Sequence, residues 1–248
     1  MSTLRIAIQK SGRLHEESME LLKDIGISID NGKDQLKAAA RDFPVEVFYL
    51  RNGDIPQYLR DGVVDAAIIG ENIIIEKGND LPFVERLGFS KCKVSIAVPK
   101  ESDASSLKDL AGKEIATSYP ETVKRFLDAQ GISAKLHIIN GSVEIAPNIG
   151  LADGICDIVS SGSTLFKNGL KEIEVLLKSE AVLAISPKMD DERKAILAKI
   201  QFRIHSVLKG RNSKYILLNA PNDKLDEIIK VLPGMRSPTV LPLAEKGW

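Results

Sequence analysis

Short apolar runs rich in β-branched residues alternate with segments of helical character along almost the whole chain. Such alternation is typical of a parallel sheet flanked by helices, because each crossover between parallel strands usually contains a helix. The helical segment HEESMELLKDIG (15–26) is amphipathic and follows the first run directly. The first candidate strands are LRIAIQ (4–9), VEVFYL (45–50), DAAIIG (65–70) and CKVSIAV (92–98). The sequence therefore predicts an α/β fold.

A second series of the same kind follows the stretch PKESDASS (99–106), whose Pro, Ser and charged residues indicate a hinge. Its helix is ETVKRFLDAQG (121–131). Its candidate strands are EIATSYP (114–120), AKLHII (134–139) and CDIVSS (156–161). We interpret the second series as a second α/β lobe.

The long apolar run IEVLLKSEAVLAIS (173–186) can return the chain to the first lobe. Two crossings between lobes are typical of a periplasmic-binding-protein-like core. We therefore expect residues 1–98 with 183–202 to form the first lobe and residues 99–182 to form the second.

Residues 203–248 read as a small third domain of the α+β class, which follows a helix predicted at 190–210. An Asn-capped helix is predicted at NDKLDEIIKVLP (222–233). Candidate strands flank it at KYILLNAP (214–221) and TVLPLAE (239–245). This is one βαβ half of a ferredoxin-like sandwich, so we expect a partial domain.

The skeleton Asp-Gly-x-x-Asp-x-x-x-x-Gly occurs twice, at residues 61–70 and 153–162. In each copy a mostly apolar run ends at a glycine before a predicted helix. A strand, a glycine turn and a helix N-terminus together form an anion site, because free backbone N–H groups and the helix dipole point outward there. The repetition predicts two similar lobes that offer ligand-binding edges to a shared cleft.

The second copy continues into hydroxyl-bearing residues and predicts a site for a phosphate monoester. Backbone N–H groups and hydroxyls could bind the phosphate, and Asp157 could accept hydrogen bonds from vicinal ribose hydroxyls. The alternative is ordinary N-capping by Ser or Thr without a ligand. The candidate residues are Asp157, Ser160, Ser161, Gly162, Ser163, Thr164 and Leu165.

Cations follow the first two predicted strands. Lys10 and Arg13 flank a Ser-Gly turn after the first strand, and Arg51 follows the second. Ligands of open α/β sheets bind at the carboxyl ends of strands. Cations at a helix N-terminus oppose its dipole, so a bound anion would compensate for them. Solvated charges are the alternative, but three cations together favour a triphosphate or a departing pyrophosphate.

Further candidates have plain structural alternatives. Gly70, Glu71 and Asn72 could meet a purine edge or help to hold a metal, or simply cap a helix. Tyr119 could stack on a base, although a single Tyr more often packs in a core. Glu144 follows a Gly-Ser turn and could compensate a helix dipole.

Composition excludes several classes of function. The 34 basic and 34 acidic residues balance, which argues against a general nucleic-acid or membrane-surface binder. No apolar run approaches the roughly 18 residues of a membrane span, and no signal peptide is visible, so we expect a cytoplasmic protein. The two cysteines read as buried thiols, and the three histidines lack metal-ligand spacing. No catalytic triad is visible.

Several motifs, taken in order, resemble the ATP phosphoribosyltransferase family over essentially the whole chain. They are LRIAIQKSGRL, DIPQYLRDGVVDAAIIGEN, KRFLDAQGI, NGSVEIAPNIGLADGICDIVSSGSTL and KYILLNAP. The third domain resembles the regulatory domain of the family's long, self-sufficient form. A short form of the family lacks it and depends on a separate subunit.

The resemblance implies the first step of histidine biosynthesis. N1 of the adenine of ATP attacks the anomeric carbon of phosphoribosyl pyrophosphate, and pyrophosphate leaves with Mg²⁺ bound to it. It implies catalytic roles for Lys10, Arg51 and Asp157. It also implies that the residues from Ser160 to Leu165 bind the 5′-phosphate. The implied ATP contacts are Lys10, Arg13, Gly70, Glu71, Asn72, Tyr119 and Glu144.

The resemblance also implies feedback inhibition by histidine and homo-oligomers from dimers to hexamers. Two departures from the family pattern stand out. Gln35 replaces an arginine of some relatives, and Lys33 or Lys37 could take its place. The third domain is short, which predicts weakened inhibition. The competing hypothesis is a cytosolic bilobal sensor that binds a small molecule without catalysis.

Overall fold

The computed structural model describes residues 2–30, 35–78, 80–160, 162–211, 213–232, 238–245 and 247. The chain divides into two compact units, Met1–Leu208 and Lys209–Trp248. The last helix of the first unit, α6 (Asp191–Arg211), runs through the boundary predicted at residue 203. Ile204 of this helix is buried in the core of the first unit, which is why the unit extends further than predicted.

The first unit contains two sheets, and the first of them has six strands in the order β2-β3-β1-β4-β11-β5. Its central strands are parallel: β1 pairs in parallel with both β3 and β4. The other three strands pair antiparallel. The strands are β1 (Leu4–Gln9), β2 (Lys37–Ala39), β3 (Val45–Leu50), β4 (Ala66–Gly70), β5 (Phe83–Arg86) and β11 (Ala181–Ile185).

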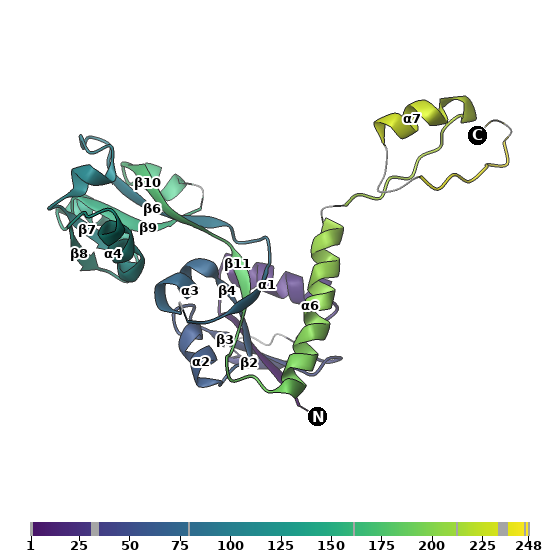
Figure 1. Ribbon diagram of the computed structural model, residues 1–248, viewed down its shortest axis with the longest axis horizontal. Helices are drawn as coiled ribbons and strands as arrows, with labels where there is room; N and C mark the ends of the chain where they lie inside the picture. Colours follow the sequence, from purple (N-terminus) through teal and green to yellow (C-terminus); the bar gives the residue numbers. More distant parts are fainter. Residues whose placement is uncertain are drawn as a thin grey trace. The chain divides into compact units, whose positions relative to one another are not determined.

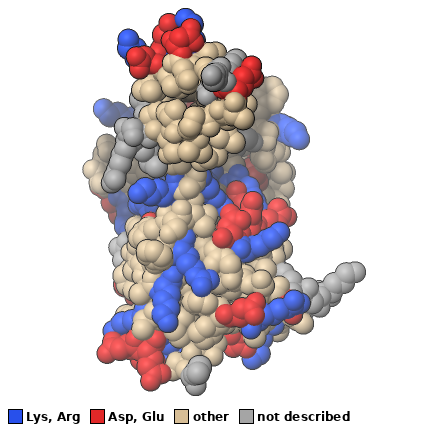
Figure 2. All heavy atoms as spheres, turned by 90° about the vertical axis from the view of Figure 1, so that its right-hand side faces the viewer, with Lys and Arg blue, Asp and Glu red and all other residues tan. Residues whose placement is uncertain are grey.

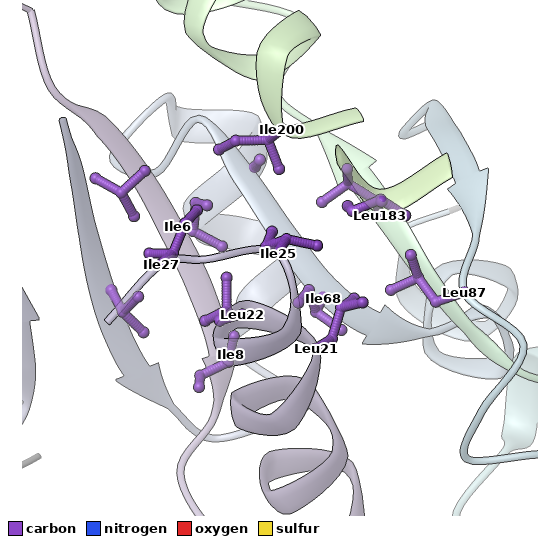
Figure 3. Close-up of a cluster of buried hydrophobic side chains, with 14 of the residues drawn as sticks. Ile6, Ile8, Leu21, Leu22, Ile25, Ile27, Ile68, Leu87, Leu183 and Ile200 are labelled. Atoms are coloured by element: carbon purple, nitrogen blue, oxygen red, sulfur yellow. The ribbon is translucent and has the colours of Figure 1, made fainter. Parts of the chain in front are cut away.

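Helices cover both faces of this first sheet, as the α/β prediction requires. The helices are α1 (Arg13–Asp24), α2 (Ile55–Asp61), α3 (Glu71–Lys77) and α6. On one face Ile6, Ile8 and Ile68 pack against Leu21 and Leu22 of α1 (Figure 3). Side chains alternate across a strand, so the neighbouring Ala67 and Ile69 face the other way, into the cluster that contains α2 and α3.

The second sheet has five strands in the order β10-β6-β9-β7-β8. Strand β7 pairs parallel with β8 and β9, while β6 is antiparallel to β9 and β10. The strands are β6 (Cys92–Pro99), β7 (Glu114–Thr117), β8 (Lys135–Ile138), β9 (Gly154–Val159) and β10 (Leu170–Ser179). Its helices are α4 (Pro120–Ala129) and α5 (Ser163–Lys167). Figure 1 shows the two sheets as separate groups of strands. The two-lobed α/β prediction is confirmed.

The first crossing between lobes lies earlier than the sequence predicted. Strand β6 pairs with β9 and β10, so residues 92–98 belong to the second lobe. The stretch at 99–106 follows β6 within that lobe and makes no crossing. An apolar run fits either sheet equally well, because pairing partners are not visible in the run itself. The return crossing lies between β10 and β11, inside the predicted run at 173–186.

The C-terminal unit contains helix α7 (Leu225–Val231), which confirms the core of the helix predicted at 222–233. The strands predicted at 214–221 and 239–245 are wrong for the described residues, which form no sheet there. A strand needs a hydrogen-bonded neighbour, and their side chains stand largely in solvent instead, with Tyr215 91% and Leu217 82% exposed. Figure 2 shows a broad uncharged surface on this unit.

None of the helices in the described part of the chain is long and apolar enough to cross a membrane.

Candidate active site

Two cations stand side by side at the carboxyl edge of the first sheet. Gln9 of β1 is paired with Leu50 of β3, and the backbone N–H of Lys10 donates to the carbonyl oxygen of Leu50 (2.8 Å). Lys10 and Arg51 therefore follow neighbouring strand ends, as predicted, and both are exposed. Within the described residues neither side chain has an ion-pair partner. Two uncompensated cations at a strand edge suit a polyanionic ligand.

Arg13 lies at the start of α1 after Gly12, whose φ of 86° belongs to the left-handed region that favours glycine. A guanidinium N–H of Arg13 donates to the carbonyl oxygen of Lys91 (3.0 Å), beside the first crossing. Arg13 thus lies at the junction of the two lobes. The structure brings it toward the second lobe and leaves Lys10 at the strand edge.

Gly70 ends β4 at the same sheet edge, because Ile8 of β1 is paired with Ile68 of β4. A Cβ atom on Gly70 would stand 2.3 Å from Oδ1 of Asn72, so a larger residue does not fit there. Glu71 follows, and both its carboxylate oxygens accept hydrogen bonds from the guanidinium of Arg86. The carboxylate is therefore held in a fixed orientation.

Asn72 and Tyr119 are buried, with 2% and 6% of their surfaces exposed. The amide of Asn72 donates to the hydroxyl of Tyr119 (2.8 Å), which connects the two lobes. Burial raises the pKa of Tyr119. Their polar atoms bind each other and not an open surface, so their contact with ATP stays a prediction. Neither sequence position alone indicated this pairing.

Asp157 lies beside Ser118 at the carboxyl edge of the second sheet, because Thr117 is paired with Cys156. Its Oδ1 accepts hydrogen bonds from Ser118 Oγ (3.0 Å) and from the backbone N–H of Ile158 (2.8 Å). Burial raises the pKa of this carboxyl, and the nearby carboxylate of Glu144 adds to the effect.

The turn after β9 leads into α5 through Gly162, whose φ is 75°. Nothing lies within 4 Å of the place where a Cβ of Gly162 would stand. Ser160, Ser163 and Thr164 are exposed around the turn, whereas Leu165 is buried and anchors α5 to the lobe. The turn therefore offers hydroxyls and open space. Ser161 lies outside the described residues.

From the sequence we expect Lys33 or Lys37 to supply the cation that Gln35 lacks. Gln35 is exposed. Lys37 lies in β2, where its ammonium pairs with Glu46 (2.9 Å). Lys33, the other predicted replacement, lies outside the described residues.

A cavity of about 400 Å³ connects the two lobes where the chain crosses between them. It adjoins both strand edges, since Glu71 and Ser160 line it. Arg86 and Lys93 pair with acidic side chains there, while Lys91 and Lys178 have no ion-pair partner among the described residues. The lining residues are Glu71, Arg86, Lys91, Cys92, Lys93, Val159, Ser160, Lys178, Ser179 and Glu180.

The sequence analysis missed the basic lining residues of this cavity. Lys91 and Lys93 flank Cys92 at the start of β6, where alternating charge reads as an ordinary solvent face. Lys178 lies at the end of β10. Only the crossing geometry brings these three lysines together, so no local signal could have identified them.

No group of three or more His, Cys, Asp or Glu residues that could hold a metal occurs in the described ranges. The three histidines lie apart: His15 contacts the carbonyl oxygen of Gln9, and the other two contact separate glutamates. A second cavity, of about 440 Å³, lies in the C-terminal unit and is lined mainly by aliphatic side chains. The polar chemistry is therefore concentrated between the lobes.

Two α/β lobes, two crossing strands and a cavity between the lobes with several cations in its lining define a bilobal α/β protein. Residues 51–206 match the ATP phosphoribosyltransferase family, and residues 210–248 match the family described as HisG, C-terminal domain. The chain belongs to the ATP phosphoribosyltransferase family.

Individual relatives agree with this assignment. An ATP phosphoribosyltransferase of Cytophaga hutchinsonii is 53% identical over 249 residues, which cover 100% of this chain and 87% of that protein. The solved ATP phosphoribosyl transferase (HisG:HisZ) complex from Thermotoga maritima aligns with a TM-score of 0.73 at 26% identity, covering 85% of this chain and 100% of that one. The arginine-bound protein Tv2483 shares the fold, with a TM-score of 0.58 at 14% identity, 84% of this chain and 86% of that one.

Proposed function

We propose that this chain transfers the phosphoribosyl group of phosphoribosyl pyrophosphate to N1 of the adenine of ATP, the first step of histidine biosynthesis. Family membership supports the reaction. The observation that carries it is the different chemistry of the two strand edges: the first sheet ends in the cations Lys10 and Arg51, which are unpaired among the described residues, and the second ends in the carboxylate of Asp157 beside a hydroxyl-rich glycine turn.

The second lobe binds phosphoribosyl pyrophosphate in this proposal. Asp157 accepts hydrogen bonds from the ribose hydroxyls, and its own contact with Ser118 orients the carboxylate. The turn from Ser160 to Thr164 receives the 5′-phosphate on hydroxyls and backbone N–H groups. Leu165 contributes by anchoring the turn, because its side chain is buried.

The first lobe binds ATP and the leaving group. Lys10 and Arg51 stand at one strand edge, where they neutralise phosphate charge. Arg13 lies at the crossing, and Glu71 is held by Arg86 with its backbone beside Gly70. Arg51 is assigned to the pyrophosphate from the family resemblance, and its side chain, exposed and unpaired among the described residues, is available for that role.

The protein supplies orientation and charge stabilisation in this reaction. The bond from N1 to the anomeric carbon forms as the bond from that carbon to pyrophosphate breaks, and the electron pair leaves with pyrophosphate. Positive charge develops on the ribose, next to the Asp157 carboxylate, and negative charge develops on the leaving group, next to Lys10 and Arg51. No covalent nucleophile is needed.

Mg²⁺ is proposed to enter with the pyrophosphate of the substrate. The ion keeps water and phosphate oxygens as ligands and needs only one or two carboxylates from a protein. Asp157 fits this requirement, because its carboxylate has no ion-pair partner among the described residues.

Regulation and assembly form the finer part of the proposal. The match of residues 210–248 to the HisG, C-terminal domain supports a regulatory role for the C-terminal unit. We propose histidine as a feedback inhibitor, homo-oligomers as the working form and the cytoplasm as the location. The T. maritima relative is described as a complex with HisZ. Measuring inhibition by millimolar histidine, and the mass of the particle in solution, tests these points.

The reaction is tested by incubating the protein with ATP, phosphoribosyl pyrophosphate and Mg²⁺, with pyrophosphatase to pull the equilibrium. We expect phosphoribosyl-ATP to form. Arg51→Gln should abolish most turnover, while the matched surface variant Lys23→Gln should behave as wild type. Binding of both ligands without any product would reject the proposal.

A further inference from the structure

Besides the two crossing segments, buried hydrogen bonds join α3 of the first lobe to the start of α4 in the second. Helix α4 has no side-chain cap of its own at Tyr119. Its free backbone donors are bound by Glu76 of α3 instead. One carboxylate oxygen of Glu76 accepts from the N–H of Glu121 (3.0 Å), and the other accepts from the N–H (2.8 Å) and Oγ1 (2.7 Å) of Thr122. A carboxylate of one lobe thus completes a helix of the other.

The contact is reciprocal. Arg125 of α4 donates to the carbonyl oxygen of Ile75, near the C-terminal end of α3. Each helix therefore receives from the other lobe a partner for a backbone group at or near one of its ends. Glu76 is only 8% exposed, so water competes little for these bonds. Such a pair of contacts fixes both the distance and the rotation between the two helices.

A second set of bonds ties the same helices to the return crossing. Asn72 of α3 donates from its amide to the hydroxyl of Tyr119 (2.8 Å). The hydroxyl of Ser179, at the end of β10, donates to Oδ1 of Asn72 (2.9 Å) and accepts from its backbone N–H (3.0 Å). Every polar atom of the Asn72 side chain is thereby engaged. The set spans both lobes and one of the strands that connect them.

The proposed active site has two half-sites, one around Glu71 in the first lobe and one around Asp157 in the second. The bonds of Asn72 and Tyr119 lie one residue away from a residue of each half-site. Tyr119 follows Ser118, which donates to Asp157 in the second lobe. Asn72 follows Glu71, which lines the cavity from the first lobe. A shift of α4 relative to α3 would therefore move Asp157 relative to Glu71. Reacting groups must meet within roughly 3–3.5 Å, and a misplacement of about 1 Å can cost about a hundredfold in rate.

We propose that Glu76, Asn72, Tyr119 and Thr122 form an interlobe latch that sets the spacing of the two half-sites. They act as positioning residues through the spacing of the lobes, a role that replaces the ATP contacts predicted for Asn72 and Tyr119. The proposal rests on the proposed function to the extent that the half-sites hold the two substrates. The latch explains why Asn72 and Tyr119 are buried, which binding of ATP does not.

The latch is tested with two isosteric variants and two matched controls. Glu76→Gln places an amide N–H against a backbone N–H, so at least one bond is lost. Tyr119→Phe removes the hydroxyl that Asn72 binds. The controls are Glu20→Gln on the exposed side of α1 and Tyr58→Phe, a residue that is 37% exposed.

The first readout needs no activity. Amide hydrogen exchange should accelerate at Glu121 and Thr122 by about tenfold or more in Glu76→Gln, as expected when a local opening becomes easier. It should not change in Glu20→Gln. Unchanged exchange at these two amides would show that Glu76 does not hold α4 and would overturn the latch.

The second readout separates positioning from folding. Calorimetric titration with phosphoribosyl pyrophosphate counts the binding-competent sites and gives the Kd of that substrate. A separate titration with ATP gives the Kd of ATP. In Glu76→Gln and Tyr119→Phe we expect both Kd values within about twofold of wild type and kcat per binding site about tenfold lower. A merely structural role would leave kcat per site unchanged, which would reject the proposal. If the wild type made no phosphoribosyl-ATP, the proposed function would fail, and the exchange result alone would decide the latch.

Discussion

The two Asp-Gly skeletons look alike in sequence, but they meet their strands at different points. In the first copy Asp65 precedes β4 and Gly70 ends it. In the second copy β9 already begins at Gly154 and contains Asp157, and it stops before Gly162. Asp65 thus precedes its strand, whereas Asp157 lies inside β9, level with the residue that follows the carboxyl end of β7. Ligands bind at carboxyl ends, so only the second aspartate stands where chemistry is expected.

Their surroundings differ accordingly. The side chain of Asp65 is 3% exposed and pairs with Arg5 (2.7 Å) and Arg193 (3.3 Å). Asp157 has no ion-pair partner in the described part of the chain and accepts two hydrogen bonds, from Ser118 and Ile158. The carboxylate of Asp65 forms ion pairs that stabilise the fold, whereas the carboxylate of Asp157 remains available to a ligand. A shared motif therefore indicates a shared structural unit, and the strand position decides which copy is functional.

The largest expected effect is that of Asp157→Asn on activity. The variant keeps the shape of the side chain but removes the charge beside the developing positive ribose. Losing one such electrostatic contact costs about 10²–10³ in kcat. Steady-state kinetics should show this loss, while thermal unfolding should show no loss of stability. A kcat within tenfold of wild type would place the ribose elsewhere.

Asp65→Asn should reverse the pattern. Removing one partner of a buried pair costs about 3–5 kcal/mol, and we expect the low end, about 3 kcal/mol, because both arginines keep 28% of their side-chain surface in solvent. Denaturant unfolding measures the loss. The kcat per folded molecule should stay near that of wild type. If Asp65→Asn were instead inactive and fully stable, the two copies would be functionally equivalent and the comparison would fail.

The sequence predicted β1, β3 and β4 of the first sheet because their patterns are local, but it missed the short strands β2 and β5. The runs at 4–9 and 45–50 coincide with β1 and β3, whose apolar side chains fill both faces. Which sheet β6 joins could not be predicted, because it depends on pairing with β9 and β10. The wrong strands at 214–221 and 239–245 show the same limit. Their patterns are strand-like, and the described unit offers no partner strand.

The candidate site shows a similar division. Lys10 and Arg51 were predictable because a residue after a strand reaches the sheet edge wherever that strand lies, and Asp157 was predictable from the glycine turn that follows its strand. The pairing of Asn72 with Tyr119 and the capping of α4 by Glu76 were not. Each joins residues of different lobes, and the relative placement of two lobes leaves no periodic trace in either segment.

The glycines that end the two skeletons extend the comparison. Gly70 has an ordinary φ of −68°, so an alanine is tolerated by the backbone, but its Cβ would stand 2.3 Å from Oδ1 of Asn72. Gly70→Ala should displace that amide and leave buried polar groups unpaired, at about 1–3 kcal/mol. Thermal unfolding checks the loss, and a substitution without any effect would show that Asn72 can move freely.

Gly162→Ala should cost less. Its backbone is left-handed at φ 75°, and nothing lies within 4 Å of the added atom. The cost is the conformational strain alone, about 1–2 kcal/mol, and it falls on the open turn that we propose for the 5′-phosphate. We therefore expect a raised KM for phosphoribosyl pyrophosphate with an unchanged KM for ATP. A change in both would mean that the turn serves both substrates.

The smallest effect is a pH dependence that only the second aspartate should show. Burial raises the pKa of Asp157 above its usual value of 3.8, so the folded protein binds this proton more tightly than the unfolded chain does. The resulting stabilisation is complete below the usual pKa and disappears as the pH rises through the raised one. Two hydrogen bonds to the carboxylate oppose this rise in the pKa. Relative to Asp157→Asn, the wild type should therefore lose stability across that window and stay level above it. The free energy of unfolding of both proteins, measured as a function of pH, tests this. If the wild type instead gained stability over Asp157→Asn as the pH rose, the hydrogen bonds would outweigh burial. Asp157 would then stabilise the fold, as Asp65 does.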